Sequence, residues 1–174
     1  MNTEISWWYD EFKQVGRDYG DLSEVARYDA SHADFRDIKD ESNRVLDRIA
    51  VSEGDSIIDL GCGTGVFAIE AAQRGVRVHA VDISHAMLSH ARAAVERERV
   101  DGVTFHHAGF LTHEHPEYTA DAVVTTFALH HLPDFWKGVA LGRIQRMLKP
   151  EGLFFIHDVI IEANDCIDKY CSIY

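Results

Sequence analysis

Cysteine, long apolar runs and clusters of basic residues are all scarce in this sequence, and each scarcity excludes a class of protein. The three cysteines, Cys62, Cys166 and Cys171, are scattered and form no C-x-x-C pair. This argues against a disulfide scaffold or a zinc site and favours a reducing compartment. No apolar stretch approaches the length of a membrane span, and the N-terminus lacks a basic region followed by an apolar core. We therefore expect a cytoplasmic protein with no membrane span.

The balance of charge is acidic. The formal net charge is −12, and no run of lysine or arginine interrupts it. Because a phosphate-rich partner would be repelled rather than attracted, we expect no nucleic-acid substrate. With 174 residues, of which 46% are hydrophobic, the chain is long enough for one globular domain with a full core.

The most informative segment is residues 57–65, which read IIDLGCGTG and are followed by Asp82. This segment predicts a buried strand that turns tightly through three glycines into a helix. A Cβ at the glycines would obstruct both the turn and the approach of a ligand to backbone N–H groups. A second strand over residues 76–81 then places the Asp82 carboxylate where it can accept both hydroxyls of a ribose. Together, these parts predict a site for a nucleoside cofactor.

The spacing of the glycines distinguishes between cofactors. Dinucleotide-binding folds use G-x-G-x-x-G, but Val66 stands at the third glycine's place here and Gly65 precedes it. A nicotinamide dehydrogenase is therefore disfavoured. The pattern D-x-G-x-G-x-G, which begins at Asp59, resembles motif I of the class I S-adenosylmethionine-dependent methyltransferases. That cofactor has no pyrophosphate, and its ammonium group suits an acidic residue near the loop.

Three further blocks resemble the same family and follow in the family's order. Residues 81–84 are similar to the end of its second strand, residues 121–132 to its fourth strand and the loop behind it, and residues 148–154 to the turn into its fifth strand. The small-molecule branch that includes quinone-biosynthesis methyltransferases looks most similar. The resemblance implies an α/β, Rossmann-like, doubly wound and mostly parallel sheet in the order 3-2-1-4-5. It places the site at the C-terminal edge, beside the first strand.

The N-terminal part is expected to be a separate helical segment. Ile5, Trp8, Phe12 and Val15 have helical spacing, and a longer helix is expected from about Asp34. We expect residues 1–50 to form a lid over the cofactor and the acceptor pocket, and residues 51–174 to form the cofactor-binding domain. The alternative is that the aromatic side chains only anchor the first helix to that domain.

The C-terminal part departs from the family. About sixteen residues follow Asp158, too few for the crossover helix and strands six and seven with which the family usually ends. An apolar fifth strand, over residues 153–156, would then form a bare edge of the sheet. Two explanations remain open. The chain is a truncated version of a longer protein, or a partner subunit completes the sheet, as in a homodimer formed through this edge.

The resemblance implies a set of cofactor-binding residues. Asp59 would lie near the methionine end of the cofactor, or it would instead hold the glycine loop through backbone N–H groups. Where this chain has Gly109, the family often has an aspartate that bonds the adenine amino group. The N–H and ring of Phe110 are candidates to replace that contact, and the alternative is that Phe110 belongs to the core. The full set is Asp59, Gly61, Cys62, Gly63, Gly65, Asp82, Ile83, Met87, Phe110, Phe127 and Tyr28.

His130 and His131 are the candidate catalytic residues, because they follow the strand end (residues 126–128) that is expected beside the sulfonium. Methyl transfer is an in-line displacement in which positioning supplies most of the acceleration. A base is needed only if the nucleophile must lose a proton, and imidazole suits that task near neutral pH. The alternative is that one histidine packs under the loop and bonds its backbone. His106, His107, His113 and His115 lack zinc-site spacing, so we expect them to face solvent and expect no metal.

These observations predict an S-adenosylmethionine-dependent methyltransferase that acts on a small organic acceptor. No Asn-Pro-Pro-Tyr or Asp-Pro-Pro-Tyr sequence is present, so methylation of an amide or of a base amine is disfavoured. The alternative is a non-catalytic or truncated S-adenosylmethionine-binding subunit that a partner completes. Activity toward a panel of acceptors would distinguish the two.

Overall fold

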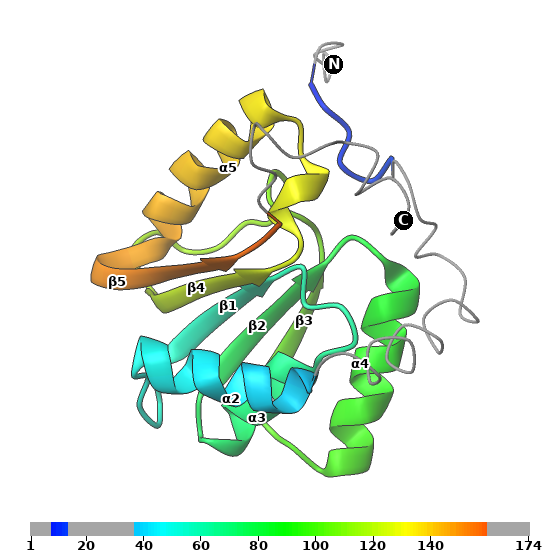
Figure 1. The fold of residues 1–174 in the computed structure, drawn as a ribbon, viewed down its shortest axis with the longest axis vertical. Coiled ribbons are helices and arrows are strands. Elements are labelled where there is room, and N and C mark those ends of the chain that lie inside the picture. Colours follow the sequence, from blue (N-terminus) through cyan, green and yellow to red (C-terminus); the bar gives the residue numbers. More distant parts are fainter. Residues whose placement is uncertain (1–7, 14–36, 160–174) are drawn as a thin grey trace.

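The computed structural model describes residues 8–13 and 37–159. At the centre of the fold lies a five-stranded parallel sheet (Figure 1). The strand order is β3-β2-β1-β4-β5, and every neighbouring pair is parallel. The elements are α2 (Ile38–Ile49), β1 (Ser56–Leu60), α3 (Val66–Gln73), β2 (Arg77–Asp82), α4 (His85–Glu98), β3 (Val103–His107), β4 (Ala120–Thr126), the 3-10 helix η1 (Leu129–His131), α5 (Asp134–Met147) and β5 (Leu148–His157). The Rossmann-like fold class and the order 3-2-1-4-5 are therefore confirmed.

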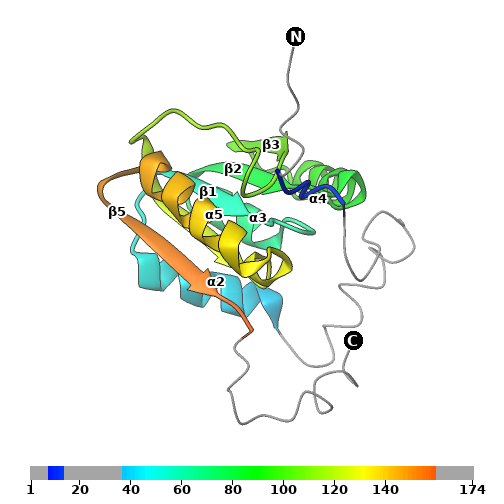
Figure 2. The same ribbon diagram turned by 90° about the horizontal axis from the view of Figure 1, so that it is seen from above.

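The helices form two layers, with α2, α3 and α4 on one face of the sheet and α5 on the other (Figures 1 and 2). The central strand β1 shows how the sequence produces these layers, because successive side chains of a strand point to opposite faces. Ile57 packs in the core beside α2 and α3, whereas Ile58 packs in the core beneath α5. Both side chains are fully buried, which explains why β1 is apolar on both faces.

Side-chain caps set the beginnings of two helices. Asp37 accepts a hydrogen bond from Asp40 N–H at 2.9 Å and begins α2. Ser84 accepts from Met87 N–H at 3.2 Å and begins α4. No helix in the described ranges is both long and apolar enough to cross a bilayer.

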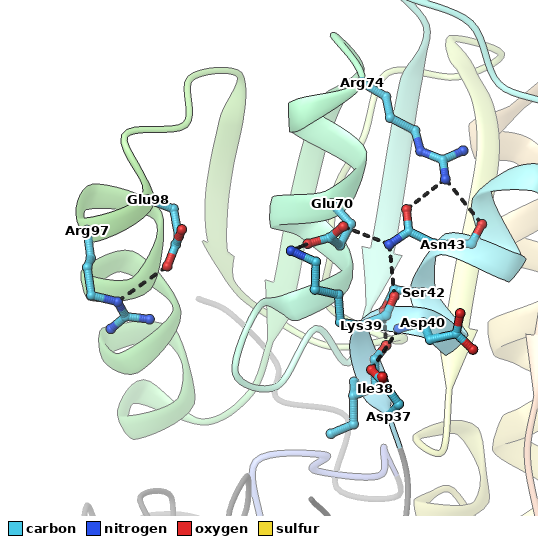
Figure 3. Close-up of polar contacts among 10 residues, drawn as sticks. All are labelled: Asp37, Ile38, Lys39, Asp40, Ser42, Asn43, Glu70, Arg74, Arg97 and Glu98. Carbon is cyan, nitrogen blue, oxygen red and sulfur yellow. Dashed lines mark hydrogen bonds and ion pairs between the residues drawn. The ribbon is translucent and has the colours of Figure 1, made fainter.

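A polar network fastens α2 to α3 (Figure 3). Glu70 of α3 is buried, and its carboxylate accepts from Asn43 Nδ2 at 2.7 Å and pairs with Lys39 Nζ at 3.0 Å. Arg74 then donates to Asn43 Oδ1 at 2.7 Å and pairs with Asp47 at 2.6 Å. Glu70 can be buried on a helix whose other buried residues are apolar, because each polar group of the network has a partner. The network holds α2 in place beside the sheet.

The strand β5 forms one edge of the sheet within the described ranges. Its side chains Leu153 and Ile156 are 49% and 46% exposed. The strand begins at Leu148, five residues earlier than the sequence predicted, because Leu148 pairs with Ala120 before a register shift. Within the described ranges, this edge of the sheet is therefore apolar and partly exposed.

The N-terminal prediction was wrong where the structure tests it. Within residues 8–13 the chain forms a bend and a turn rather than a helix. Asp10 Oδ1 accepts from Phe12 N–H at 3.1 Å, a local bond that competes with helix formation. The second helix begins at Ile38 instead of near Asp34, because Asp37 caps it. The rest of the predicted first helix lies outside the described residues.

Candidate cofactor site

The loop after β1 is held at close range against β2 and β4. The N–H groups of Gly61 and Cys62 donate to the Val81 carbonyl oxygen at 2.8 and 3.0 Å. Gly61 has a φ of +81°, and a Cβ at this residue would collide with the Cβ of Ala128, just beyond β4. Because neither the backbone angle nor the space admits a side chain, glycine is required here. The end of β4 therefore lies directly against the glycine loop.

Asp82 ends β2 and binds the glycine loop through its carboxylate. Its Oδ2 accepts from Gly63 N–H at 2.9 Å, and its Oδ1 accepts from Ser84 N–H at 2.8 Å. Burial raises the pKa of this carboxyl, while the two N–H groups oppose the shift. A carboxylate offers about four acceptor positions, so each oxygen retains capacity for a further donor. The two neighbouring hydroxyls of a ribose are donors of this kind.

Asp59 lies at the end of β1, and its side chain is 2% exposed. Burial raises its pKa to about 7, with the charge of Asp82 as the second cause. Its Oδ2 has no hydrogen-bond partner within the described ranges, although buried carboxylate oxygens normally have one. A cationic group bound beside the loop would favour the ionised form of Asp59. The residues present therefore fit a cofactor with a ribose and an ammonium group.

Phe127 is the first residue after β4, and it has an unusual backbone conformation. Its φ is +53°, which is uncommon for a residue with a side chain and tends to occur at functional sites. Two contacts with β5 hold it: its N–H donates to the His157 carbonyl oxygen at 2.8 Å, and the two rings lie 4.5 Å apart. The edge strand thus fixes the position of the Phe127 ring.

The two predicted histidines of η1 have different surroundings. The His130 N–H donates to Asp158 Oδ2 at 3.0 Å, and His130 Nδ1 lies 2.6 Å from Oδ1 of the same carboxylate. His130 therefore ties η1 to the end of β5, and it is not among the residues that line the cleft. His131 does line the cleft. Desolvation and the neighbouring His130 lower the pKa of His131, so its ring is neutral and able to accept a proton near neutral pH.

The short N-terminal segment 8–13 forms one wall of the cleft. Glu11 is buried, and its carboxylate accepts from Leu111 N–H at 3.0 and 3.1 Å and from the Thr112 hydroxyl at 2.6 Å. Trp8 packs edge-on against Trp136 of α5, with the ring centroids 4.9 Å apart. Contacts on both sides therefore hold the segment against the carboxyl edge of the sheet.

These elements enclose a cleft at the carboxyl ends of β1, β2 and β4, where ligands bind in open α/β sheets. About 940 Å³ of empty space, counting the open mouth, lies between its walls. The lining residues are Tyr9, Glu11, Lys13, Gly61, Gly63, Asp82, Ile83, Ser84, Met87, Ala108, Gly109, Phe110, Thr126, Phe127, Ala128, His131 and Leu132.

The cleft brings together most of the predicted site residues but not all of them. Those that line it are Gly61, Gly63, Asp82, Ile83, Met87, Phe110, Phe127 and His131. The others have different surroundings in the fold. Cys62 is in the core and Asp59 is buried behind the loop. A Cβ on Gly65 would lie 2.8 Å from the Cβ of Ala91 in α4. The absence of a side chain at Gly65 therefore allows α4 to pack closely, and it does not make room for a ligand. Tyr28 lies outside the described residues.

Sequence reasoning did not single out Glu11 and Lys13 as lining residues, whereas Tyr9 belongs to the aromatic cluster of the predicted lid. The contact of Glu11 with Leu111 spans 100 residues of chain, and no local pattern in the sequence indicates it. An acidic residue three places after Trp8 reads as part of an ordinary solvated helix face. The only available signal was the missing acidic side chain at Gly109, which leaves room for a group from another element.

Four histidines, His79, His106, His113 and His115, lie close together. The prediction that His113 faces solvent was wrong because this residue is buried, and His106 and His115 are half-buried. His113 is 1% exposed, His79 Nδ1 lies 3.1 Å from His106 Nε2, and the rings of His79 and His115 lie 4.7 Å apart. Burial is the main cause that lowers the pKa of His79 to about 4 and of His113 to about 3. These rings are therefore neutral. In the part of the chain that the structure describes, no group of three or more potential ligands is arranged to hold a metal ion.

Comparison with known proteins agrees with this geometry. A family profile described as "Methyltransferase domain" matches residues 57–152, more than half of the chain. An uncharacterized methyltransferase of Geobacillus kaustophilus is 29% identical over 159 residues, which cover 87% of this chain and 71% of the relative.

Solved structures of methyltransferases have the same fold. A phosphoethanolamine N-methyltransferase of Haemonchus contortus, in complex with phosphomonomethylethanolamine and S-adenosylhomocysteine, is 29% identical with a TM-score of 0.63. The match covers 76% of this chain and 32% of that one. An S-adenosylmethionine-dependent methyltransferase of Methanococcus maripaludis is 18% identical with a TM-score of 0.70, and the match covers 82% of this chain and 65% of that one. The chain thus spans less than two thirds of these solved chains. It belongs to the class I S-adenosylmethionine-dependent methyltransferases.

Proposed function

We propose that this chain transfers the methyl group of S-adenosylmethionine to a small organic acceptor bound beside His131. The observation that carries the proposal is one cleft whose lining brings Gly61, Gly63 and Asp82 together with Phe127 and His131. The first group suits a nucleoside, and the second lies where the reacting end of the cofactor would be. The acceptor-binding relative from Haemonchus contortus also holds a small molecule.

Different residues of the chain would bind different parts of the cofactor. Asp82 would accept the ribose hydroxyls, and the backbone of Gly61 and Gly63 would admit the cofactor at close range. The buried carboxylate of Asp59 would attract the ammonium group of the cofactor. When bound, S-adenosylmethionine supplies a methyl group attached to a positively charged sulfur, and this sulfur keeps the electron pair of the C–S bond that breaks. The strained backbone at Phe127 would position the ring beside that carbon.

His131 would act as the base when the attacking atom of the acceptor carries a proton. Its lowered pKa keeps the imidazole in the form that accepts a proton near neutral pH. His130 would act through position alone, because its ring is bound to Asp158. The segment 8–13 would serve as the lid predicted for residues 1–50. The exposed Leu153 and Ile156 would let β5 pair with a second copy of the chain as a homodimer.

The experiment begins with calorimetric titration of the full chain with S-adenosylmethionine, S-adenosylhomocysteine and NADH. Binding of both sulfur compounds and none of NADH is expected. Incubation with a panel of small phenols, amines and carbon acids would then be followed by mass spectrometry for gain of one methyl group. Binding without transfer to any acceptor would favour the alternative of a non-catalytic binding subunit. No binding of either sulfur compound would contradict the proposal.

A further inference from the structure

The cleft contains an acidic group that comes from an unexpected element. Gly109 follows β3 and has no side chain, and Glu11 of the N-terminal segment fills the adjacent space. A Cβ on Gly109 would lie 2.5 Å from Glu11 Oε2 and 2.6 Å from its Cδ. No side chain fits at residue 109 while Glu11 is seated, so the two residues are complementary. Both line the cleft, next to Ile83.

The Glu11 carboxylate is held firmly and retains acceptor capacity. Its oxygens share the N–H of Leu111, and Oε1 also accepts the hydroxyl of Thr112 at 2.6 Å. Oε2 therefore has only the shared N–H as a donor within the described ranges. Lys13 does not neutralise it, because its ammonium lies 3.9 Å from Asp10 instead. A buried, charged acceptor with unused lone pairs favours a ligand that carries an N–H donor.

The position of Glu11 indicates which part of the cofactor it would meet. In the order of the sheet, the end of β2 with Asp82, the proposed ribose partner, lies between the end of β3, after which Gly109 stands beside Glu11, and the end of β4, which Phe127 follows. With the ribose at Asp82 and the reacting methyl beside His131, the base would extend toward Gly109, Phe110 and Glu11. The donor that a purine base of this kind presents is its exocyclic amino group.

We propose that Glu11 accepts a hydrogen bond from the adenine amino group and so supplies, from the N-terminal segment, the acidic contact that Gly109 cannot make. This proposal rests on the proposed function, because it requires the cofactor in this cleft. Glu11 would then determine specificity for adenine and couple closure of segment 8–13 to occupancy by the cofactor. The competing interpretation is that Glu11 only anchors the segment through Leu111 and Thr112.

The test separates these roles by removing the amino group from the ligand. Adenosine and purine riboside, which lacks the exocyclic amino group, are titrated calorimetrically into the full chain, with S-adenosylhomocysteine as the reference ligand. The variants are Glu11→Ala and Glu11→Gln, and Asp10→Ala is the matched control. The Asp10→Ala substitution removes one carboxylate from the same segment, and Asp10 is not among the lining residues.

The ratio of the two nucleoside affinities is the deciding quantity, because loss of the segment's anchor affects both nucleosides equally. We expect the unmodified chain and Asp10→Ala to prefer adenosine by roughly tenfold, the scale of a hydrogen bond to a charged group. Glu11→Ala is expected to abolish the preference. Glu11→Gln, which keeps the side-chain size, is expected to reduce it because an amide is the weaker acceptor.

Two outcomes would overturn the proposal, and they differ from each other. If Glu11→Ala weakens both nucleosides equally and keeps their ratio, Glu11 is an anchor only, and the proposed function is unaffected. If the unmodified chain fails to bind S-adenosylhomocysteine, the proposed function and the role of Glu11 both fail.

Discussion

Replacing Gly61 by alanine tests the claim that the glycine loop and the end of β4 are built against each other. Two penalties are expected. Gly61 has a φ of +81°, and an L side chain in the left-handed region costs roughly 1–2 kcal/mol. The new methyl group would also collide with the Cβ of Ala128, and overpacking of this kind costs roughly 1–3 kcal/mol. The free energy of unfolding should therefore fall by roughly 2–5 kcal/mol.

Two companion variants separate these penalties. Gly63→Ala is the matched control, because Gly63 has a φ of +52° but nothing within 4 Å of its ideal Cβ. It should lose only the backbone part, roughly 1–2 kcal/mol. Combining Gly61→Ala with Ala128→Gly should recover the collision part and leave the backbone part. The assay is urea unfolding of all variants, read as a double-mutant cycle. A coupling energy near zero would refute the argument, since it would mean that Gly61 and Ala128 are not in contact.

Three further predictions concern the site and the histidine cluster. Asp82→Ala should weaken binding of S-adenosylhomocysteine by roughly 1–3 kcal/mol through loss of bonds to a charged acceptor; unchanged affinity by calorimetry would place the ribose elsewhere. His131→Ala should lower turnover of a proton-bearing acceptor and leave cofactor affinity unchanged, as rapid-quench assays and titration would show; equal turnover would exclude His131 as the base. The pKa of His113 is lowered to about 3 from the ordinary 6.5, so its stabilising contribution is complete above pH 6.5 and is lost as the pH falls toward 3. Urea unfolding at about pH 7 and about pH 5 should differ by on the order of 1–2 kcal/mol from this residue, and His113→Phe should reduce that difference; an equal pH dependence in the variant would contradict the assignment.

The sheet could be predicted because its signals are local. Residues 57–60 are apolar on both faces with a single acid, a pattern that only a central parallel strand requires. The glycine spacing and Asp82 identified the cofactor class because tight turns and strand ends impose fixed residue types.

The predictions that failed concern contacts between distant segments. Residues 8–13 have apolar residues at helical spacing, yet the bonds of Asp10 and Glu11 hold them as a turn against the sheet. The histidines near residue 113 looked polar and exposed, but His113 is buried and His106 and His115 are half-buried. Periodicity describes which residues share a face, but it does not say which surface will cover that face.

The sequence by itself determined the glycine loop, the strand before it and the position of Asp82, because glycine geometry and strand burial depend on neighbouring residues. The strand order and the identity of the cofactor followed from the resemblance to the methyltransferase family. Only the tertiary structure decided which of His130 and His131 faces the cleft, since Asp158 binds one of them from another strand. It also decided that Glu11 stands beside Gly109. Both outcomes depend on side chains brought together from remote parts of the chain, where the free energy of a contact is set by packing rather than by the order of residues.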